Sequence, residues 1–228
     1  QTNKSARVLG TTRRKTGRLI VRTFEQVIAT REQLREVLKE PSELVTLKTL
    51  DHLDKFCGMF VGRSPFALLA TADAAGNTDI SPKGDPAGFV KVLDDRTLVI
   101  PDRPGNHRAD SLENILQNPK VGLIFMIPGK TETLRVSGTA TIVRDQALLD
   151  SMAVQGRSPA LAIAVHVEEA FFHCSKCMIR SGLWKTGQWP DLEGLPRLAE
   201  TMVEAGKLPL SEEQMHDIVV NDERERLY

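Results

Sequence analysis

The spacing of hydrophobic residues changes near residue 65. Before that point it is helical: a helix is predicted over 31–40, where Thr30 caps the first turn with Gln33 three residues on, and a second over 50–61. After it, short apolar or alternating runs are separated by Gly, Pro, Asn and Asp, a pattern typical of strands and tight turns. Strands are predicted over 66–71, 78–81, 89–93, 97–100, 121–127, 133–143 and 162–172.

Only short helical segments interrupt these strands. They are predicted over 111–117, with Asp110 as N-cap and Glu113 at the capping-box position, over 145–154, and in the tail over 195–206 and 211–226. About seven closely spaced strands without long intervening helices do not fit a parallel sheet. The pattern favours a mainly β fold, an antiparallel β-barrel with flanking helices.

The charges are segregated along the chain. In total, 30 Lys and Arg balance 30 Asp and Glu over 228 residues, but residues 1–22 carry seven cations and no acid, whereas 191–228 carry ten acids and four cations. We therefore predict a basic arm (1–22), a central domain (23–190) and an acidic helical tail (191–228) packed on that domain, and we expect the arm to lie on the acidic tail of its own or a partner subunit. The arm lacks an aromatic stacking platform, which disfavours nucleic-acid binding.

Composition excludes several classes of protein. No run of about 18 apolar residues predicts a membrane-spanning helix, and the polar, basic first residues do not resemble a secretory signal. Three cysteines argue against a disulfide scaffold. We therefore expect a protein of the reducing cytoplasm.

A loop rich in Gly, Pro, Asn and Arg, residues 100–110, leads directly into the helix at 111–117. Free N–H groups and the helix dipole at such a terminus favour an anion. Side-chain donors for a phosphate are supplied by Arg103, Asn106, Arg108 and Ser111, and by Lys83 from the 81–88 loop. The same residues also fit a solvated loop before a capped helix, so both interpretations stay open. His107 lies in this loop and is a further candidate ligand contact.

A second cluster lies at 173–184. If this segment is helical, Lys176, Arg180 and Trp184 share one face and offer two cations and an indole to an anionic aromatic ligand; the alternative is two solvated cations and a core tryptophan. His173, Cys174 and Cys177 supply at most half of a zinc site, and buried inert thiols are the simpler reading. We predict no metal site. No nucleophile motif accompanies these residues.

Four motifs together resemble the pyridoxamine 5′-phosphate oxidase-like, FMN-binding split-barrel family, over about residues 45–228, in the branch described as probable FMN-dependent enzymes. They are Ser81-Pro-Lys-Gly-Asp85, Asp102-Arg-Pro-Gly-Asn106 with Arg108-x-Asp-Ser111, Asn118-Pro119 before a strand, and His173-Cys-x-Lys-x-x-x-Arg-Ser-x-Leu-Trp184.

The resemblance implies a six-stranded antiparallel split barrel that forms a homodimer with FMN at the subunit interface. It also implies cofactor-binding residues: Ser81, Lys83, Arg103, Asn106, Arg108 and Ser111 at the phosphate and ribityl chain, and Lys176, Arg180 and Trp184 near the flavin, from the same or the partner subunit. The catalytic residues are not indicated.

The sequence departs from the oxidases that act on vitamin B6. Their C-terminal Arg-Leu-His-Asp-Arg signature is missing, and the chain ends in Glu-Arg-Glu-Arg-Leu-Tyr228. We therefore expect an FMN-dependent oxidoreductase acting on another small molecule. The alternatives are a non-catalytic flavin-binding or sensing module, and a deazaflavin or haem ligand in the same barrel.

Overall fold

The computed structural model describes residues 24–228, so the arm at 1–22 and its predicted contact with the acidic tail lie outside the described residues. The chain forms two compact units, Gln1–Ser42 and Glu43–Tyr228. In the first, α1 (Arg31–Val37) has the predicted cap, because Gln33 N–H donates to Thr30 Oγ1 at 3.3 Å. The helix ends three residues earlier than predicted, where Leu38 takes an extended backbone, and it buries none of its residues.

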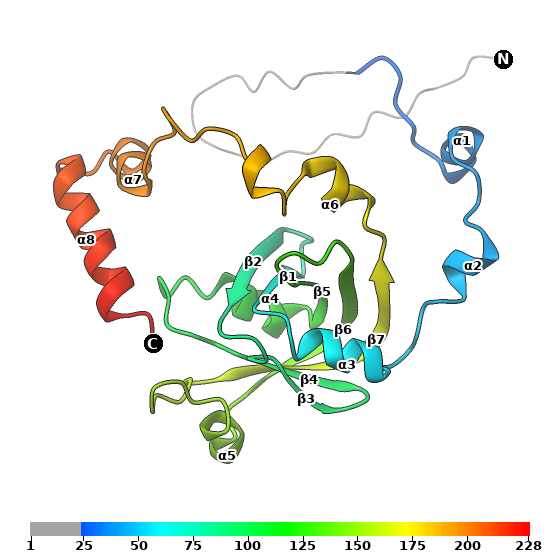
Figure 1. The fold of residues 1–228 in the computed structure, drawn as a ribbon, viewed down its shortest axis with the longest axis horizontal. Helices are drawn as coiled ribbons and strands as arrows, with labels where there is room; N and C mark the ends of the chain where they lie inside the picture. Colours follow the sequence, from blue (N-terminus) through cyan, green and yellow to red (C-terminus); the bar gives the residue numbers. More distant parts are fainter. Residues whose placement is uncertain (1–23) are drawn as a thin grey trace. The chain divides into compact units, whose positions relative to one another are not determined.

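The second unit is built on one antiparallel sheet of seven strands. These are β1 (Phe66–Ala72), β2 (Thr78–Gly84), β3 (Lys91–Asp94), β4 (Thr97–Pro101), β5 (Lys120–Met126), β6 (Thr133–Val143) and β7 (Ala162–His173). Their order is β2-β1-β5-β6-β7-β4-β3, and the sheet curls without closing, since β2 and β3 remain its two edges (Figure 1). The count agrees with the strand spacing and exceeds the six strands that the resemblance implied, because the β3–β4 hairpin adds the short edge strand β3.

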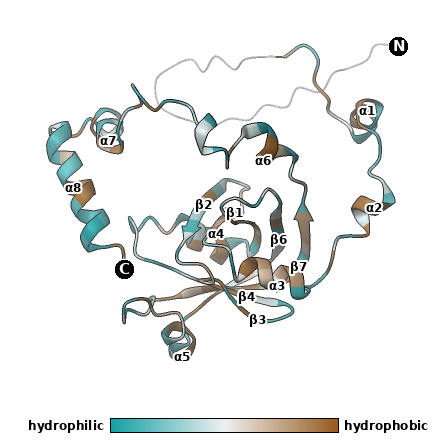
Figure 2. Ribbon diagram, in the orientation of Figure 1, coloured by the Kyte–Doolittle hydropathy of each residue, from teal (hydrophilic) through white to brown (hydrophobic). Residues whose placement is uncertain are grey.

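The core lies inside the curl of the sheet. Leu69, Phe125, Leu134, Val136 and Val165 are at most 1% exposed. Figure 2 shows hydrophobic residues on the strands and also on flanking helices such as α3. The inward residues alternate with outward ones along β1 and β5, as expected of strands with one buried face.

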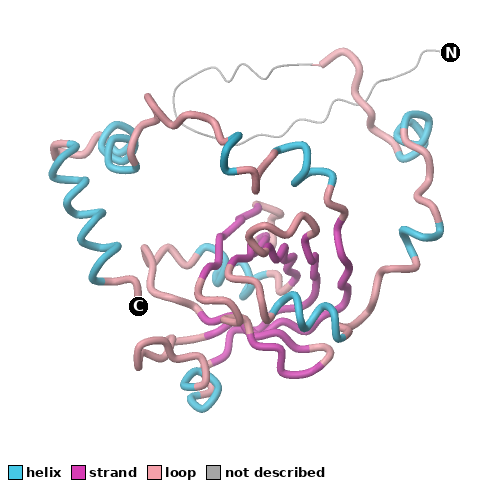
Figure 3. The backbone as a smooth tube through the Cα atoms, in the orientation of Figure 1, coloured by secondary structure: helices cyan, strands magenta, loops and turns pink. Residues whose placement is uncertain are grey.

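Short helices flank the sheet (Figure 3). They are α2 (Glu43–Thr46), α3 (Lys55–Val61), α4 (Asp110–Gln117), α5 (Gln146–Asp150), α6 (Lys176–Ser181), the 3₁₀ turn Thr186–Gln188, α7 (Leu198–Gly206) and α8 (Glu212–Glu225). The segment predicted as helix 50–61 becomes helical only at Lys55, because Asp54 caps it by accepting from Cys57 N–H at 2.8 Å. Within residues 24–228, no helix combines the length and apolar character needed to cross a membrane.

Two local predictions around the loops were wrong. The N-cap of α4 is Ala109, in the left-handed conformation (φ 58°), and not Asp110, whose carboxylate accepts instead from Arg108 Nε at 2.7 Å. The strand predicted over 78–81 continues to Gly84, so Ser81 and Lys83 lie on a strand and not in a loop. Pro82 is tolerated there because β2 is an edge strand and its missing N–H leaves no ladder bond unmade.

Candidate functional site

A cleft of about 970 Å³ lies between β2, the segment from β4 to α4, the 157–161 loop and Tyr228. This volume is near the upper end of the range of about 300–1,000 Å³ that small-molecule and cofactor sites occupy. Six of the predicted cofactor-binding residues line it together: Ser81, Lys83, Arg103, Asn106, Arg108 and Ser111. The structure thus brings these six residues together at one cleft, and their role in binding a cofactor stays a prediction.

Lys83 is the least committed cation of the cleft. Alternation along β2 puts Asp79, Ser81 and Lys83 on the half-buried face of the strand. The Lys83 side chain is 18% exposed, and its Nζ lies 3.9 Å from Asp102 Oδ1, too far for a hydrogen bond. Burial raises the pKa of Asp102, and the nearby Lys83 charge opposes that rise. The ammonium thus keeps its donors available for a ligand.

Arg103 is fixed. Its Nε donates to Asp85 Oδ2 at 2.6 Å and its Nη2 donates to the Met152 carbonyl oxygen at 2.8 Å. Asp85 is 1% exposed at its side chain, so this is a buried ion pair with a second anchor on the guanidinium. Arg103 therefore has a defined orientation before any ligand arrives.

The loop into α4 bends sharply beside the cleft. His107 and Ala109 have positive φ values of 59° and 58°, and Asn106 Oδ1 accepts from Arg108 N–H at 3.1 Å. The N-cap Ala109 gives α4 no side-chain cap, and the first residues of the helix, Asp110 and Ser111, line the cleft. The Arg108 side chain is 71% exposed, and within residues 24–228 its one ion pair is with Asp110. A helix terminus with free N–H groups and a movable guanidinium suits an anion.

Ser111 is already used within the protein. Its Oγ donates to Asp79 Oδ2 at 2.6 Å, and the residue is buried. Asn114, one turn further along α4, donates to Thr71 Oγ1 at 3.0 Å. These two bonds hold α4 against β2 and β1. The predicted role of Ser111 as a phosphate donor thus competes with a structural one.

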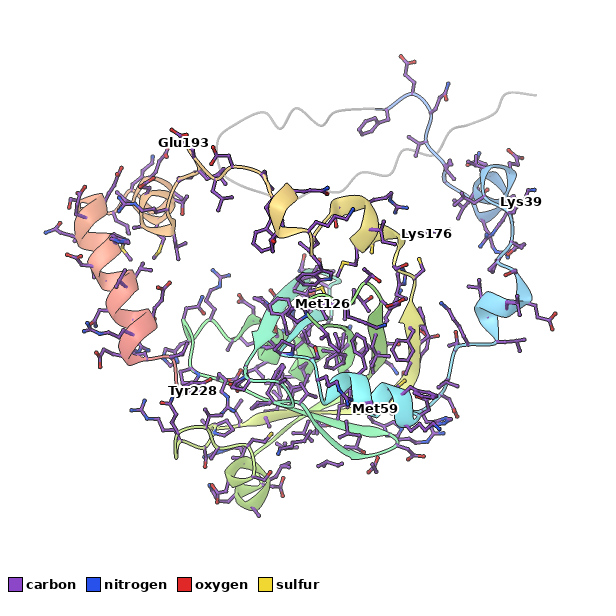
Figure 4. All side chains as sticks on the ribbon, in the orientation of Figure 1. Lys39, Met59, Met126, Lys176, Glu193 and Tyr228 are labelled. Carbon is purple, nitrogen blue, oxygen red and sulfur yellow. The ribbon has the colours of Figure 1, made fainter. Side chains whose placement is uncertain are left out.

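The residues predicted from the second cluster do not join this site. Lys176, Arg180 and Trp184 are absent from the cleft lining in the described part of the chain. The prediction that these three residues share one helical face was wrong, because α6 ends at Ser181 and Gly182 takes the left-handed conformation (φ 63°). Trp184 lies beyond that break, with its Nε1 donating to the Lys130 carbonyl oxygen at 2.7 Å. Lys176 (labelled in Figure 4) opens α6.

The cysteines differ from one another. Cys57 is 1% exposed. Its burial, and to a lesser extent its hydrogen bond with Asp54, raises the pKa of its thiol to about 12. Cys174 and Cys177 are exposed, so the expectation of buried thiols was wrong for these two. No group of three metal-ligating side chains comes together within residues 24–228.

Three residues of the site were missed by the sequence reasoning. Asp85 belongs to a motif that was noticed, but only its burial beside Arg103 shows what it does. Arg157 follows the left-handed Gly156 in the α5–β7 connection and lines the cleft. Tyr228 closes one end and donates its hydroxyl to Asp85 Oδ1 at 2.8 Å. No local sequence pattern predicts that Arg157 or Tyr228 lies at the cleft.

Comparisons with known proteins identify the family. Residues 53–174, more than half of the chain, match the family described as Pyridoxamine 5′-phosphate oxidase. No curated protein matches the sequence.

Three solved structures are similar to this chain. A protein from Lactobacillus delbrueckii described as a candidate pyridoxamine 5′-phosphate oxidase is 26% identical, with 54% of this chain and 95% of that chain covered and a TM-score of 0.43. HupZ from Group A Streptococcus is 25% identical, with 53% and 93% covered and a TM-score of 0.43. An FMN-binding protein from Syntrophomonas wolfei is 8% identical, with 51% and 82% covered and a TM-score of 0.42.

The match over 53–174 includes β1 to β7, and thus the strand, loop and helix that form most of the cleft. The family assignment rests on this sequence match. The chain belongs to the pyridoxamine 5′-phosphate oxidase family.

Proposed function

We propose that the protein is an FMN-dependent oxidoreductase acting on an unidentified small molecule, with the phosphate of FMN held in the cleft. One observation carries the proposal: Lys83 of β2, Arg103 and Arg108 of the β4–α4 loop, and Arg157 of the α5–β7 connection all line the cleft, beside the uncapped N-terminus of α4. Cations and helix N–H groups at one end of a large cleft form a phosphate site.

The residues present fit FMN. Lys83 and Arg108 are the movable cations for the phosphate, and Arg103 is the oriented one. An apolar wall for a flat ring is available as well, since Phe89 and Leu161 line the same cleft. A bound flavin supplies hydride or electron transfer, which explains why no nucleophile motif is needed; the protein binds, orients and excludes water.

We also propose that the protein is a homodimer. On the outer face of the sheet, Ile80 of β2 is 66% exposed and Ile124 of β5 is 39% exposed. The two lie on either side of β1, in which Ala70 pairs with Ile80 and Leu68 pairs with Ile124. Ile80 and its neighbour Ser81 both line the cleft as well, so this apolar face borders the site. An apolar face next to the site supports a partner subunit that covers both.

The test is an absorption spectrum of the purified protein followed by titration with FMN. We expect a bound flavin, and we expect Lys83→Met to weaken FMN binding by about 10- to 100-fold, as loss of one charge-assisted hydrogen bond does. Lys185→Met removes an exposed lysine outside the cleft and is the matched control. Light scattering of the same sample is expected to give twice the chain mass of 25.3 kDa.

A protein that gains no flavin absorption with FMN contradicts the proposal, and a co-purifying haem or deazaflavin replaces FMN in it. Anaerobic mixing of the loaded protein with NAD(P)H and candidate substrates separates an enzyme from a sensing module. A flavin that none of them reduces or reoxidises favours the module.

A further inference from the structure

Tyr228 occupies one end of the cleft and is held there by three different groups (labelled in Figure 4). Its hydroxyl donates to Asp85 Oδ1 at 2.8 Å, and the Arg103 guanidinium carbon lies 5.6 Å from the centre of its ring. Its backbone carbonyl oxygen accepts from Arg157 Nη1. Hydroxyl, ring face and carbonyl are thus each recognised by a different side chain.

Of the recognising groups, Arg103 and Arg157 line the cleft, and Asp85 is held against Arg103. Asp85 is 1% exposed, and while its Oδ2 is taken by Arg103, its Oδ1 is taken by the Tyr228 hydroxyl. If Tyr228 withdraws, one oxygen of a buried carboxylate loses its donor, and such an oxygen strongly favours a new hydroxyl donor. The planar guanidinium of Arg103, which lies over the Tyr228 ring, favours an aromatic plane at the same place.

The tail that carries Tyr228 is not part of the core. Helix α8 packs against α7, and Met215 is its one buried residue. Beyond α8, Arg226 adds a 3.3 Å contact from its Nη2 to His107 Nε2, which is exposed. Withdrawal of Tyr228 therefore breaks a few polar contacts at the cleft and leaves the hydrophobic core of the sheet unchanged.

We propose that Asp85, Arg103 and Arg157 form a subsite for a hydroxyl-bearing aromatic ring. Tyr228 fills this subsite in the structure, and a phenolic ligand fills it when the C-terminal tail moves away. The ligand class follows from the groups recognised: a phenolic hydroxyl for Asp85, a ring face for Arg103, and a carbonyl or carboxylate oxygen for Arg157. Only the statement that this ligand is a substrate rests on the proposed FMN-dependent function.

Competition with the tail sets the expected affinity. A residue tethered by a short segment acts at an effective concentration on the order of millimolar. A free phenol must therefore compete with Tyr228 in the natural chain and meets an empty subsite when the Tyr228 side chain is removed. Tyr228→Gly is expected to bind a small phenol about 10-fold more tightly than the natural chain does.

The probe is 4-fluorophenol, followed by ¹⁹F NMR line broadening on the full chain, with fluorobenzene as the ligand that lacks the hydroxyl. We expect 4-fluorophenol to bind Tyr228→Gly about 10-fold more tightly than fluorobenzene does. Tyr228→Phe keeps the ring and loses the bond to Asp85, so it is expected to give an intermediate affinity. Arg224→Gln changes an exposed residue near the same end of α8 and is expected to bind like the natural chain.

Equal affinity of the two probes for Tyr228→Gly, or equal affinity of 4-fluorophenol for Tyr228→Gly and the natural chain, overturns the proposal. A second variant tests the carboxylate: Asp85→Asn in the Tyr228→Gly background is expected to bind 4-fluorophenol several-fold more weakly. FMN titration is read separately by flavin fluorescence. If 4-fluorophenol binds and FMN does not, the subsite is supported and the proposed FMN-dependent function is contradicted. If FMN binds and 4-fluorophenol does not, the proposed function is supported and the subsite is contradicted.

Discussion

Gly138 fixes the distance between the two longest strands of the sheet. It lies on β6, where the register with β7 shifts between Ser137 and Gly138, so that Glu168 is an extra residue on β7. A Cβ at position 138 would lie 2.0 Å from the His166 carbonyl oxygen and 2.9 Å from the His166 carbonyl carbon. Both neighbours are backbone atoms, so no side chain can rotate to make room.

Gly138→Ala therefore forces β6 and β7 apart by at least about 1 Å, since a Cβ essentially never lies within 3.0 Å of another heavy atom. Overpacking of this kind costs about 1–3 kcal/mol, and each buried backbone hydrogen bond lost beside it costs about 1–3 kcal/mol more. With one such bond lost, we expect a loss of about 2–6 kcal/mol. At about 2–4 °C per kcal/mol for a chain of this size, the melting temperature falls by about 4–24 °C.

Thermal unfolding followed by circular dichroism measures this shift, and Gly122→Ala is the matched control. Gly122 lies in β5, and its added Cβ would meet only the Ala70 Cβ at 4.0 Å, an ordinary contact. The control is expected to be neutral or slightly stabilising, because alanine loses less backbone entropy than glycine. If Gly138→Ala melts within about 2 °C of the natural chain, β6 and β7 approach less closely than described and the reasoning fails.

Two further predictions concern titrating groups. Under native conditions a thiol reagent is expected to label the two exposed cysteines and to spare Cys57, because burial raises the pKa of its thiol to about 12. The number of labels is measured by intact mass, and early labelling of Cys57 contradicts its burial. Hydrogen bonds from His52 and Arg96 lower the pKa of Asp51 to about 2, so the stability from this exposed contact is present above about pH 4 and is lost as the pH falls toward about 2. Asp51→Asn is expected to reduce the loss of unfolding free energy in that pH range, and an unchanged pH dependence of stability contradicts this prediction.

The parts of the site that were predictable are those encoded locally. Arg103, Asn106 and Arg108 stand within six residues of one another before a helix, so a donor-rich loop could be recognised from spacing alone. The strand through Pro82 could not, because proline is tolerated only where a strand lies at an edge, and the edge is decided by distant pairings.

Contacts across long stretches of chain escaped prediction for the same reason. Tyr228 meets Asp85 across 143 residues and Arg157 across 71, and no periodicity relates such positions. The proposed helical stripe ending in Trp184 failed for a local reason: Gly182 in the left-handed conformation ends α6 before the stripe is complete.

The cations of the cleft divide into fixed and free ones, and this division bears on how the site works. Arg103 shares a buried carboxylate and a carbonyl oxygen, so removing it from Asp85 would leave an uncompensated buried charge. Lys83 is 3.9 Å from its nearest carboxylate, and Arg108 is mostly exposed, so both can turn to an anion at little cost. Under the proposed function, a phosphate would recruit Lys83 and Arg108 while Arg103 stays in place. Because Asp85 holds Arg103 on one side and Tyr228 on the other, the fixed pair of Asp85 and Arg103 that borders the proposed anion site also sets where an aromatic ring can lie beside it.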